Sequence, residues 1–250
     1  EKMDNRTFKE EEFPYHTLEQ FALSQEMIED LPMNVLDDLK EGRRSPLLPI
    51  HVTDDDGNTI HSRSRFKFYR KEDGSIDVLF YPQLLRCNLE QYSEEEQKAM
   101  LEGKTIVSVS PTESTGKYFV QIDQETNQVM YIPTPVIGRN LRSLMEHFHL
   151  TSAEIQIVQN GEPLTFLEED ELVTVGIDLN EKTGIRMVTG DIKRWEQQRN
   201  SQFNRYNFGL FGCWVKDENG LLDYIHEDEY TDEIWEEQKK VIAQNSAIKR

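Results

Sequence analysis

The residues whose types and spacing most clearly suggest a chemical role are acidic side chains close to the C-terminus. Ten Asp or Glu residues and no Lys or Arg lie between Asp217 and Glu237. Local structure explains some of them, because DENG at 217–220 is typical of a hairpin turn and acidic residues after Thr231 favour a helix N-terminus. A charge run is also typical of a solvated face. The other carboxylates predict a contact surface for a basic protein, such as a nuclease or DNA-handling protein that an inhibitor or DNA mimic would cover. The residues of this predicted surface are Glu227, Asp228, Glu229, Asp232, Glu233, Glu236 and Glu237.

Basic residues are concentrated in one stretch, which supports an alternative function. RSRFKFYRK at 63–71 interleaves five basic residues with aromatic ones, a pattern that could follow a nucleic-acid backbone and stack bases. A strand with period two must also place something polar on its solvent face, and a basic strand could simply meet the acidic surface of the same chain. The residues of the alternative basic patch are Arg43, Arg44, Arg63, Arg65, Lys67, Arg70 and Lys71.

Metal and catalytic patterns are weak throughout the sequence. DDDGN at 54–58 invites a calcium interpretation, but the loop register puts Val52 and Arg63 at ligand positions, so a turn is favoured. His51 and His61 could meet across that turn, although two histidines lack a third ligand. The chain has no G-x-S-x-G, G-x-G-x-x-G or P-loop motif. We therefore expect no metal, cofactor or catalytic residue and a non-enzymatic protein; an enzyme without a recognisable motif is the remaining alternative.

The composition limits the class of partner and the compartment. The net charge of −19 repels phosphate backbones and anionic lipid surfaces, so nucleic acid and membranes are disfavoured for the molecule as a whole. Hydrophobic residues at 36% and aromatic residues at 10% are enough for packed cores. Only Cys87 and Cys213 occur, no apolar run is long enough to span a membrane, and the N-terminus lacks a signal-peptide core. A cytoplasmic location is the resulting expectation.

Periodicity predicts an α+β fold made of two mixed domains, each with antiparallel hairpins or a meander packed against short helices. In the first domain, helical spacing is followed by a meander with a turn at Asp73-Gly74, a capping box at Ser93 and Glu96, and three more strands. In the second domain, a helix from Leu141 precedes hairpins predicted at Asn160-Gly161 and Asn219-Gly220. The prolines of IPTP mark the boundary between the domains. The predicted division is a polar tail 1–12, a domain 13–134, a linker 135–140 and a domain 141–250 with an acidic C-terminal helix.

Two aromatic features of the second half are assigned to its core. GLFGCW at 209–214 forms the densest aromatic cluster, and its glycines would allow a close approach of other groups. Its alternative interpretation is a recognition surface with aromatic anchors. Trp195 and Trp235 lie on predicted helices and are expected to seal the same core.

Several ordered blocks of the first half resemble one bacterial family of unknown function. These blocks are FPYHTLEQFALSQEMIEDLP, GRRSPLLPIHV, FYRKEDGSIDVLFYP, YSEEEQKAMLEGKTIV and FVQIDQETNQVMYIPT, which together cover residues 13–134. Such domains look like parts of proteins encoded on conjugative or mobile elements of gut bacteria, often near DNA-processing genes. The resemblance therefore implies an accessory protein of a mobile element, and it assigns no catalytic residue.

Overall fold

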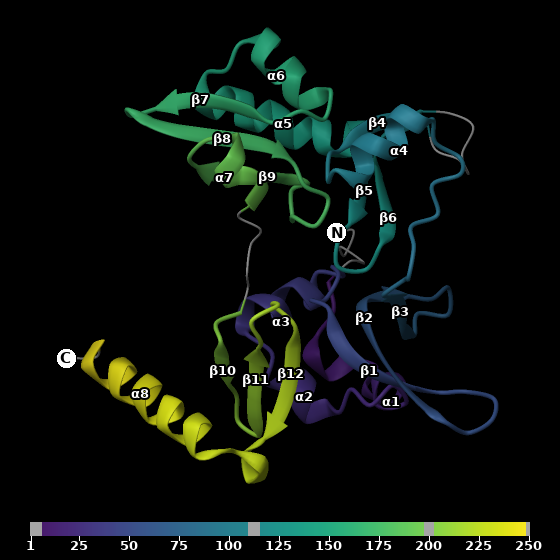
Figure 1. Ribbon diagram of the computed structural model, residues 1–250, viewed down its shortest axis with the longest axis vertical. Coiled ribbons are helices and arrows are strands. Elements are labelled where there is room, and N and C mark those ends of the chain that lie inside the picture. The colour runs from purple at the N-terminus through teal and green to yellow at the C-terminus, as the bar shows by residue number, and fades with distance from the viewer. Residues whose placement is uncertain (1–6, 110–115, 198–202, 249–250) are drawn as a thin grey trace. The chain divides into compact units, whose positions relative to one another are not determined.

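The fold is mixed α+β, as the sequence predicts. The structure is a computed structural model that describes residues 7–109, 116–197 and 203–248. These described residues form helices and four antiparallel sheets of three strands each (Figure 1). Residues 1–6 of the predicted polar tail lie outside the described residues. In the same tail, Phe8 is buried and its amide donates to the Lys40 carbonyl at 2.6 Å, so this residue belongs to the packed core.

The contacts within the chain divide it into two compact units, and the division differs from the one predicted from the sequence. Unit 1 comprises Glu1–Gln83 and Ser201–Arg250, and unit 2 comprises Leu84–Asn200. The predicted linker 135–140 lies inside helix α5, Thr134–Phe148. The prolines do not prevent this helix, because Pro133 is its N-cap and Pro135 lies in its first turn, where a proline needs no amide partner.

Unit 1 joins an N-terminal helical and meander region to a C-terminal sheet and helix. Ser24 caps α2 by accepting a hydrogen bond from the Met27 amide at 3.3 Å, as its place before the apolar periodicity predicts. The predicted meander is confirmed as the sheet β1-β2-β3, and the predicted hairpin at Asn219-Gly220 is confirmed as β11-β12. The elements of unit 1 are η1 Glu10–Glu12, α1 Tyr15–Glu19, α2 Gln25–Glu29, α3 Met33–Lys40, β1 Leu48–Thr53, β2 Thr59–Arg70, β3 Ile76–Pro82, β10 Tyr206–Phe208, β11 Gly212–Lys216, β12 Leu222–His226, η2 Glu227–Glu229 and α8 Asp232–Ile248.

One hydrophobic core holds both parts of unit 1 together. Phe66 and Phe68 of β2 point into it with the buried side chains of α1 to α3, as the alternation along the strand predicts. Phe203, Trp214 and Leu222 of the C-terminal segment belong to the same core. Trp214 is fully buried, and its indole Nε1 donates to the Met27 carbonyl at 2.9 Å. The core of unit 1 therefore needs residues that lie more than 180 positions apart in the sequence.

The described residues of unit 2 form two small sheets and four helices. The capping box of Ser93 and Glu96 is confirmed at the start of α4. The predicted hairpin at Asn160-Gly161 is wrong, because residues 152–159 form helix α6, whose N-terminus is capped reciprocally by Thr151 and Glu154. The elements of unit 2 are α4 Glu94–Leu101, β4 Ile106–Val109, β5 Lys117–Asp123, β6 Gln128–Pro133, α5, α6 Ser152–Gln159, β7 Leu164–Glu168, β8 Glu171–Ile177, β9 Ile185–Thr189 and α7 Ile192–Gln197.

The interior of unit 2 is formed mainly by the sheets and by α5 and α6. Phe119 and Met130 from the sheet β4-β5-β6 share a core with Ile137 and Leu141 of α5. Val175 of the sheet β7-β8-β9 belongs to the same core. A smaller core lies between α4 and β5. Among the residues that the structure describes, no helix combines the length and apolar character needed to cross a membrane.

Candidate functional site

A buried carboxylate holds the turn between β10 and β11. Asp30, at the C-terminal end of α2, is only 5% exposed. Its Oδ1 accepts the Leu210 amide at 2.6 Å, and its Oδ2 accepts the Phe211 amide at 3.0 Å and the Tyr224 hydroxyl at 2.5 Å. A side chain on Gly209 would overlap the Asp30 carboxyl group, so the turn needs glycine there for this close approach.

The geometry at Asp30 stabilises the neutral form of the neighbouring tyrosine. The pKa of Tyr224 is raised, first because burial disfavours the phenolate and second because its hydroxyl donates to the Asp30 carboxylate. Its ring also lies against Trp214, with the ring centroids 5.2 Å apart. The carboxylate therefore links helix α2, the β10–β11 turn and strand β12 in one network.

Two apolar side chains project from the turn that Asp30 holds. Leu210 is 84% exposed and Phe211 is 38% exposed, although both backbone amides are bonded. We call these two residues the apolar tip. The GLFGCW cluster thus separates into two parts: Cys213 and Trp214 are buried, and the apolar tip faces solvent. The core that Trp214 joins is that of unit 1, where residues 8–39 supply most of the other buried side chains.

An acidic 3-10 turn lies directly beside the apolar tip. The amide of Glu227 donates to the Phe211 carbonyl at 3.0 Å, which fixes the start of η2 against the turn. Glu227, Asp228 and Glu229 form η2, and all three are exposed. We call these three residues the acidic turn. Within the described part of the chain, their side chains make no hydrogen bond or ion pair.

The other predicted acidic residues lie on α8 and are mostly paired. Glu233 accepts the Tyr206 hydroxyl at 2.8 Å and forms an ion pair with Arg205 at 3.3 Å. Lys239 lies 2.8 Å from Glu236, and Lys240 lies 2.7 Å from Glu237. The hydrogen bond from Lys239 lowers the pKa of Glu236. Asp232 is exposed in the first turn of α8, where the helix dipole favours a carboxylate. Charge available for a partner is therefore concentrated in the acidic turn and at Asp232.

The residues of the predicted basic patch are largely occupied by partners within unit 1. Arg63 donates to the Leu222 carbonyl at 2.6 Å and to Asp223 at 2.9 Å, so it binds the C-terminal sheet. Arg65 donates to the Ser45 carbonyl at 3.2 Å. The pairs that involve the other basic residues are Arg43 with Asp38 and Glu41, Arg70 with Glu12, Lys71 with Asp77, and Arg44 over the ring of Tyr81.

The basic strand therefore meets acidic groups of the same chain, and it was the nucleic-acid patch that was the alternative interpretation of its pattern. Lys67 is half-buried on the face of β2 opposite to Phe66 and Phe68. Pairing of the neighbouring arginines with carboxylates lowers the positive potential that a phosphate backbone would need. Four of the seven residues, Arg43, Arg63, Arg70 and Lys71, are members of ion pairs, so the predicted patch is not a row of unpaired cations.

The two histidines predicted to meet across a turn do so. His51 and His61 are opposite each other on β1 and β2, and their ring centroids are 4.3 Å apart. Both side chains are exposed. In the described ranges, no group of three or more His, Cys, Asp or Glu residues is placed to hold a metal ion.

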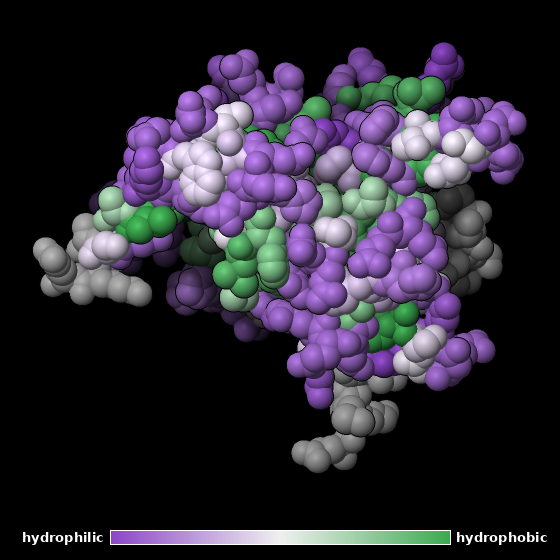
Figure 2. All heavy atoms as spheres, turned by 90° about the horizontal axis from the view of Figure 1, so that it is seen from below, coloured by the Kyte–Doolittle hydropathy of each residue, from purple (hydrophilic) through white to green (hydrophobic). Residues whose placement is uncertain are grey.

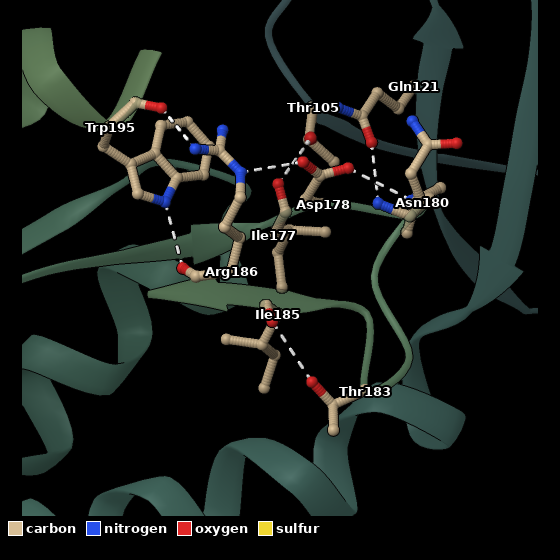
Figure 3. Close-up of polar contacts among 10 residues, drawn as sticks. Thr105, Gln121, Ile177, Asp178, Asn180, Thr183, Ile185, Arg186 and Trp195 are labelled. Carbon is tan, nitrogen blue, oxygen red and sulfur yellow. Dashed lines mark hydrogen bonds and ion pairs between the residues drawn. The ribbon is translucent and has the colours of Figure 1, made fainter. Parts of the chain in front are cut away.

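Unit 2 contains a buried ion pair that the sequence did not single out (Figure 3). Arg186 and Asp178 are both nearly inaccessible, and Arg186 Nε donates to Asp178 Oδ2 at 2.8 Å. The guanidinium also donates to the Trp195 carbonyl and lies 4.0 Å from the centre of the indole ring. The indole Nε1 in turn donates to the Arg186 carbonyl at 2.9 Å. Because these donors and acceptors satisfy one another in the interior, this network fixes the packing of α7 on β9.

Sequence reasoning found the acidic turn but missed the residue that positions the apolar tip. Asp30 lies in EDLP, where nothing in its neighbours separates a buried acceptor from an ordinary exposed acid. The available signal was indirect: the two glycines of GLFG indicate that another group approaches closely. Gly209 receives the Asp30 carboxyl group and Gly212 lies against the Tyr224 ring, which confirms that interpretation.

Comparison with known proteins gives one family match and assigns no activity. Residues 8–92 match the model of a family described as "Protein of unknown function (DUF4099)". No curated protein and no solved structure matches the chain significantly. The matched segment contains α1 to α3 and the sheet β1-β2-β3, and Asp30 lies within it, whereas the apolar tip and the acidic turn lie outside it. This N-terminal segment is therefore similar to an uncharacterised domain family; the match ends at residue 92, whereas the sequence blocks predict a resemblance up to residue 134.

Proposed function

We propose that this chain is a non-enzymatic interaction protein whose apolar tip and acidic turn together bind a basic protein. The observation that carries this proposal is that Leu210 combines a fixed backbone with an exposed side chain. Its backbone is fixed by a buried carboxylate, yet its side chain is 84% exposed. A folded chain gains nothing in stability from leaving a leucine in water, so a rigid apolar projection of this kind is better suited to a partner's pocket.

Rigidity makes the apolar tip a better binding element than a mobile loop would be. Binding normally costs about 0.5–1.5 kcal/mol for each side chain or loop residue that must be ordered. The hydrogen bonds from Leu210 and Phe211 to Asp30 have already ordered this backbone. Most of the free energy of burying Leu210, about 1.5–3 kcal/mol for a leucine side chain, would then be available for the complex.

The charges around the tip select the kind of partner. The acidic turn begins at Glu227, whose amide donates to the Phe211 carbonyl, so three exposed acidic residues start at the point where the chain contacts the apolar tip. Figure 2 shows a face on which hydrophilic side chains predominate and hydrophobic ones form small separate groups. An apolar contact with a charged surround is typical of a protein interface. With a net charge of −19, attraction to a basic surface would also accelerate association.

Nucleic-acid binding and catalysis are less well supported as functions. The arginines of the basic strand are paired with Asp223, Glu12 and other groups of unit 1, and this leaves little positive charge for phosphates. No arrangement of described residues motivates a particular reaction. A mobile-element origin and a cytoplasmic location stay predictions; a DNA-handling protein of such an element would be a basic partner of the proposed kind.

The test is a comparative capture experiment with the whole 250-residue chain as bait and host lysate as the source of partners. The tip variant is Leu210→Ser with Phe211→Ser, and the turn variant replaces Glu227, Asp228 and Glu229 with Lys. The matched control replaces Glu169, Asp170 and Glu171 with Lys, which changes the net charge equally at the exposed β7–β8 turn and the first residue of β8 in unit 2.

We expect a basic protein that the wild-type and control chains retain at low salt and that both the tip and turn variants lose. Its retention should also fall as the salt concentration rises, because the exposed carboxylates are screened. The proposal would be refuted if the control chain lost the same proteins as the turn variant, or if retention did not depend on the tip. Loss of binding after nuclease treatment would instead support nucleic acid as the ligand.

A further inference from the structure

Helix α8 carries an exposed face whose chemistry is self-complementary. Four residues of this face follow one another along the helix as apolar, acidic, basic and apolar: Trp235, Glu236, Lys239 and Ile242. At 100° per residue, these four side chains lie within an arc of about 120°. The same sequence of properties, read in the opposite direction, is apolar, basic, acidic and apolar.

All four side chains of this face are accessible. Trp235 is 37% exposed and Ile242 is 59% exposed. The side chains of Glu236 and Lys239 are exposed by about two-thirds, at 64% and 69%. Trp235 and Ile242 lie one heptad apart, so a second helix laid along α8 would contact both of them.

The rest of unit 1 contacts only the first turn of α8 among the described residues and leaves this face open. Ile234 is buried, and Glu233 receives the Tyr206 hydroxyl of β10. Trp235 is fixed by an edge-to-face contact with Tyr230, whose ring centroid lies 5.0 Å away. Beyond this first turn, every residue from Lys239 to Ser246 except the half-buried Val241 is exposed. Figure 1 shows the helix (yellow) extending from the sheet β10-β11-β12 of its unit.

We propose that a second copy of this chain packs against α8 in antiparallel orientation, with the two-fold axis between Gln238 and Lys239. In this arrangement Trp235 of each helix lies against Ile242 of the other, because the two positions are equally far from the axis. Glu236 of each helix lies beside Lys239 of the other on the same flank. Every contact then occurs twice, as a two-fold interface requires.

Charge complementarity distinguishes this arrangement from the parallel one. In a parallel pair in register, Glu236 would face Glu236 and Lys239 would face Lys239, and like charges at such positions are unfavourable. The intrahelical pair of Glu236 and Lys239, 2.8 Å apart, can exchange partners with the second copy at little cost. The apolar tip and the acidic turn take no part in the contact, so this inference is independent of the proposed function.

The first test measures the mass of the 250-residue chain by sedimentation equilibrium over a range of concentrations. We expect a transition from the monomer mass of 29.4 kDa to twice that mass. Ile242→Glu should abolish the dimer. Ile242 is exposed, so this change leaves the core of unit 1 intact, and circular dichroism checks that the helix is retained.

Charge exchange tests the orientation without removing any apolar contact. Glu236→Lys alone and Lys239→Glu alone place like charges at both symmetry-related contacts, and each should raise the dissociation constant on the order of tenfold. The double variant Glu236→Lys with Lys239→Glu is self-complementary again and should restore the wild-type constant. An equimolar mixture of the two single variants should form a mixed dimer.

Crosslinking distinguishes the two orientations directly. With a short thiol-specific crosslinker, Lys239→Cys should give a covalent dimer because this position lies next to the axis. Ile242→Cys should not, since its two copies lie at opposite ends of an antiparallel contact. A wild-type chain that stays monomeric at high concentration, a dimer that Ile242→Glu leaves unchanged, or efficient crosslinking through Ile242→Cys would overturn the proposal.

Discussion

Replacing Asp30 with alanine removes the carboxylate that joins helix α2 to the β10–β11 turn. Three hydrogen bonds are lost, from the amides of Leu210 and Phe211 and from the Tyr224 hydroxyl. Hydrogen bonds to charged groups each contribute about 1.5–3 kcal/mol. The full sum overstates the effect, because the buried carboxylate no longer has to be desolvated and water can reach the amide of an exposed residue. We expect the free energy of unfolding of unit 1 to fall by about 3–5 kcal/mol.

The assay is urea unfolding followed by nuclear magnetic resonance of the indole N–H groups. The indole of Trp214 is bonded in the core of unit 1, and the indole of Trp195 is bonded in unit 2, so each signal reports its own unit. With a urea dependence of about 2 kcal/mol per molar, the Asp30→Ala midpoint for Trp214 should fall by about 2 M. The midpoint for Trp195 should stay where it is.

Two further variants separate the role of this carboxylate from a general effect of losing an acid. Asp55→Ala removes an exposed carboxylate from the β1–β2 turn and should change the free energy of unfolding by less than about 0.5 kcal/mol. Tyr224→Phe removes one of the three hydrogen bonds and should cost about 1–2 kcal/mol. If Asp30→Ala changed the Trp214 midpoint no more than Asp55→Ala does, the anchoring of the turn would be refuted.

Three other predictions concern the remaining features of the interior. The pKa of Tyr224 is raised in the fold, so its neutral form contributes its full stabilisation to unit 1 at any pH below the ordinary tyrosine value of 10.0. Above that pH the stability of unit 1 should fall. Thermal unfolding should show a smaller fall for Tyr224→Phe than for the wild type. Asp178→Ala removes the carboxylate that pairs with the buried Arg186 guanidinium and should lower the free energy of unfolding of unit 2 by about 3–5 kcal/mol. Replacing Asp178 with Leu and Arg186 with Met should lower it by less. The opposite order of the two variants in urea unfolding would contradict this prediction. Gly176→Ala would place a Cβ 2.6 Å from the buried indole of Trp195 and should destabilise unit 2 by about 1–3 kcal/mol. Gly138→Ala adds a Cβ in open space on α5 and should stabilise unit 2 by about 0.5–1 kcal/mol. Melting curves of the two variants would show this difference in sign.

Local patterns predicted the individual elements well where one signal dominated. The alternation of Phe66 and Phe68, the Asp73-Gly74 turn and the Ser93 capping box each produce the expected structure. The prediction of a hairpin at Asn160-Gly161 was wrong because two sequence signals competed there. Asn-Gly favours a hairpin, but the reciprocal cap at Thr151 starts a helix, which then ends at that dipeptide. At this position the helix cap at Thr151 therefore determines the structure, and the Asn-Gly dipeptide only ends the helix.

Long-range organisation could not be obtained from local patterns. Nothing near Trp214 indicates that it packs with Met27 and Leu18 rather than with residues of the preceding hundred positions. The same holds for Asp30, whose partners lie about 180 residues away. The acidic turn was predicted as a contact surface from charge alone, whereas its position beside Leu210 depends on a tertiary hydrogen bond. A single sequence records composition and period, and neither specifies such pairs.

Site-specific photocrosslinking in the host tests the central claim most directly. A photoreactive phenylalanine analogue at Leu210 should give one covalent adduct with a basic protein, and this adduct should disappear when the acidic turn is replaced with Lys. The same analogue at Leu167, an apolar residue of unit 2 that is 70% exposed, serves as the control and should not give that adduct. Absence of an adduct at Leu210, or the same adduct at both positions, would contradict the assignment of the apolar tip and the acidic turn as the binding surface.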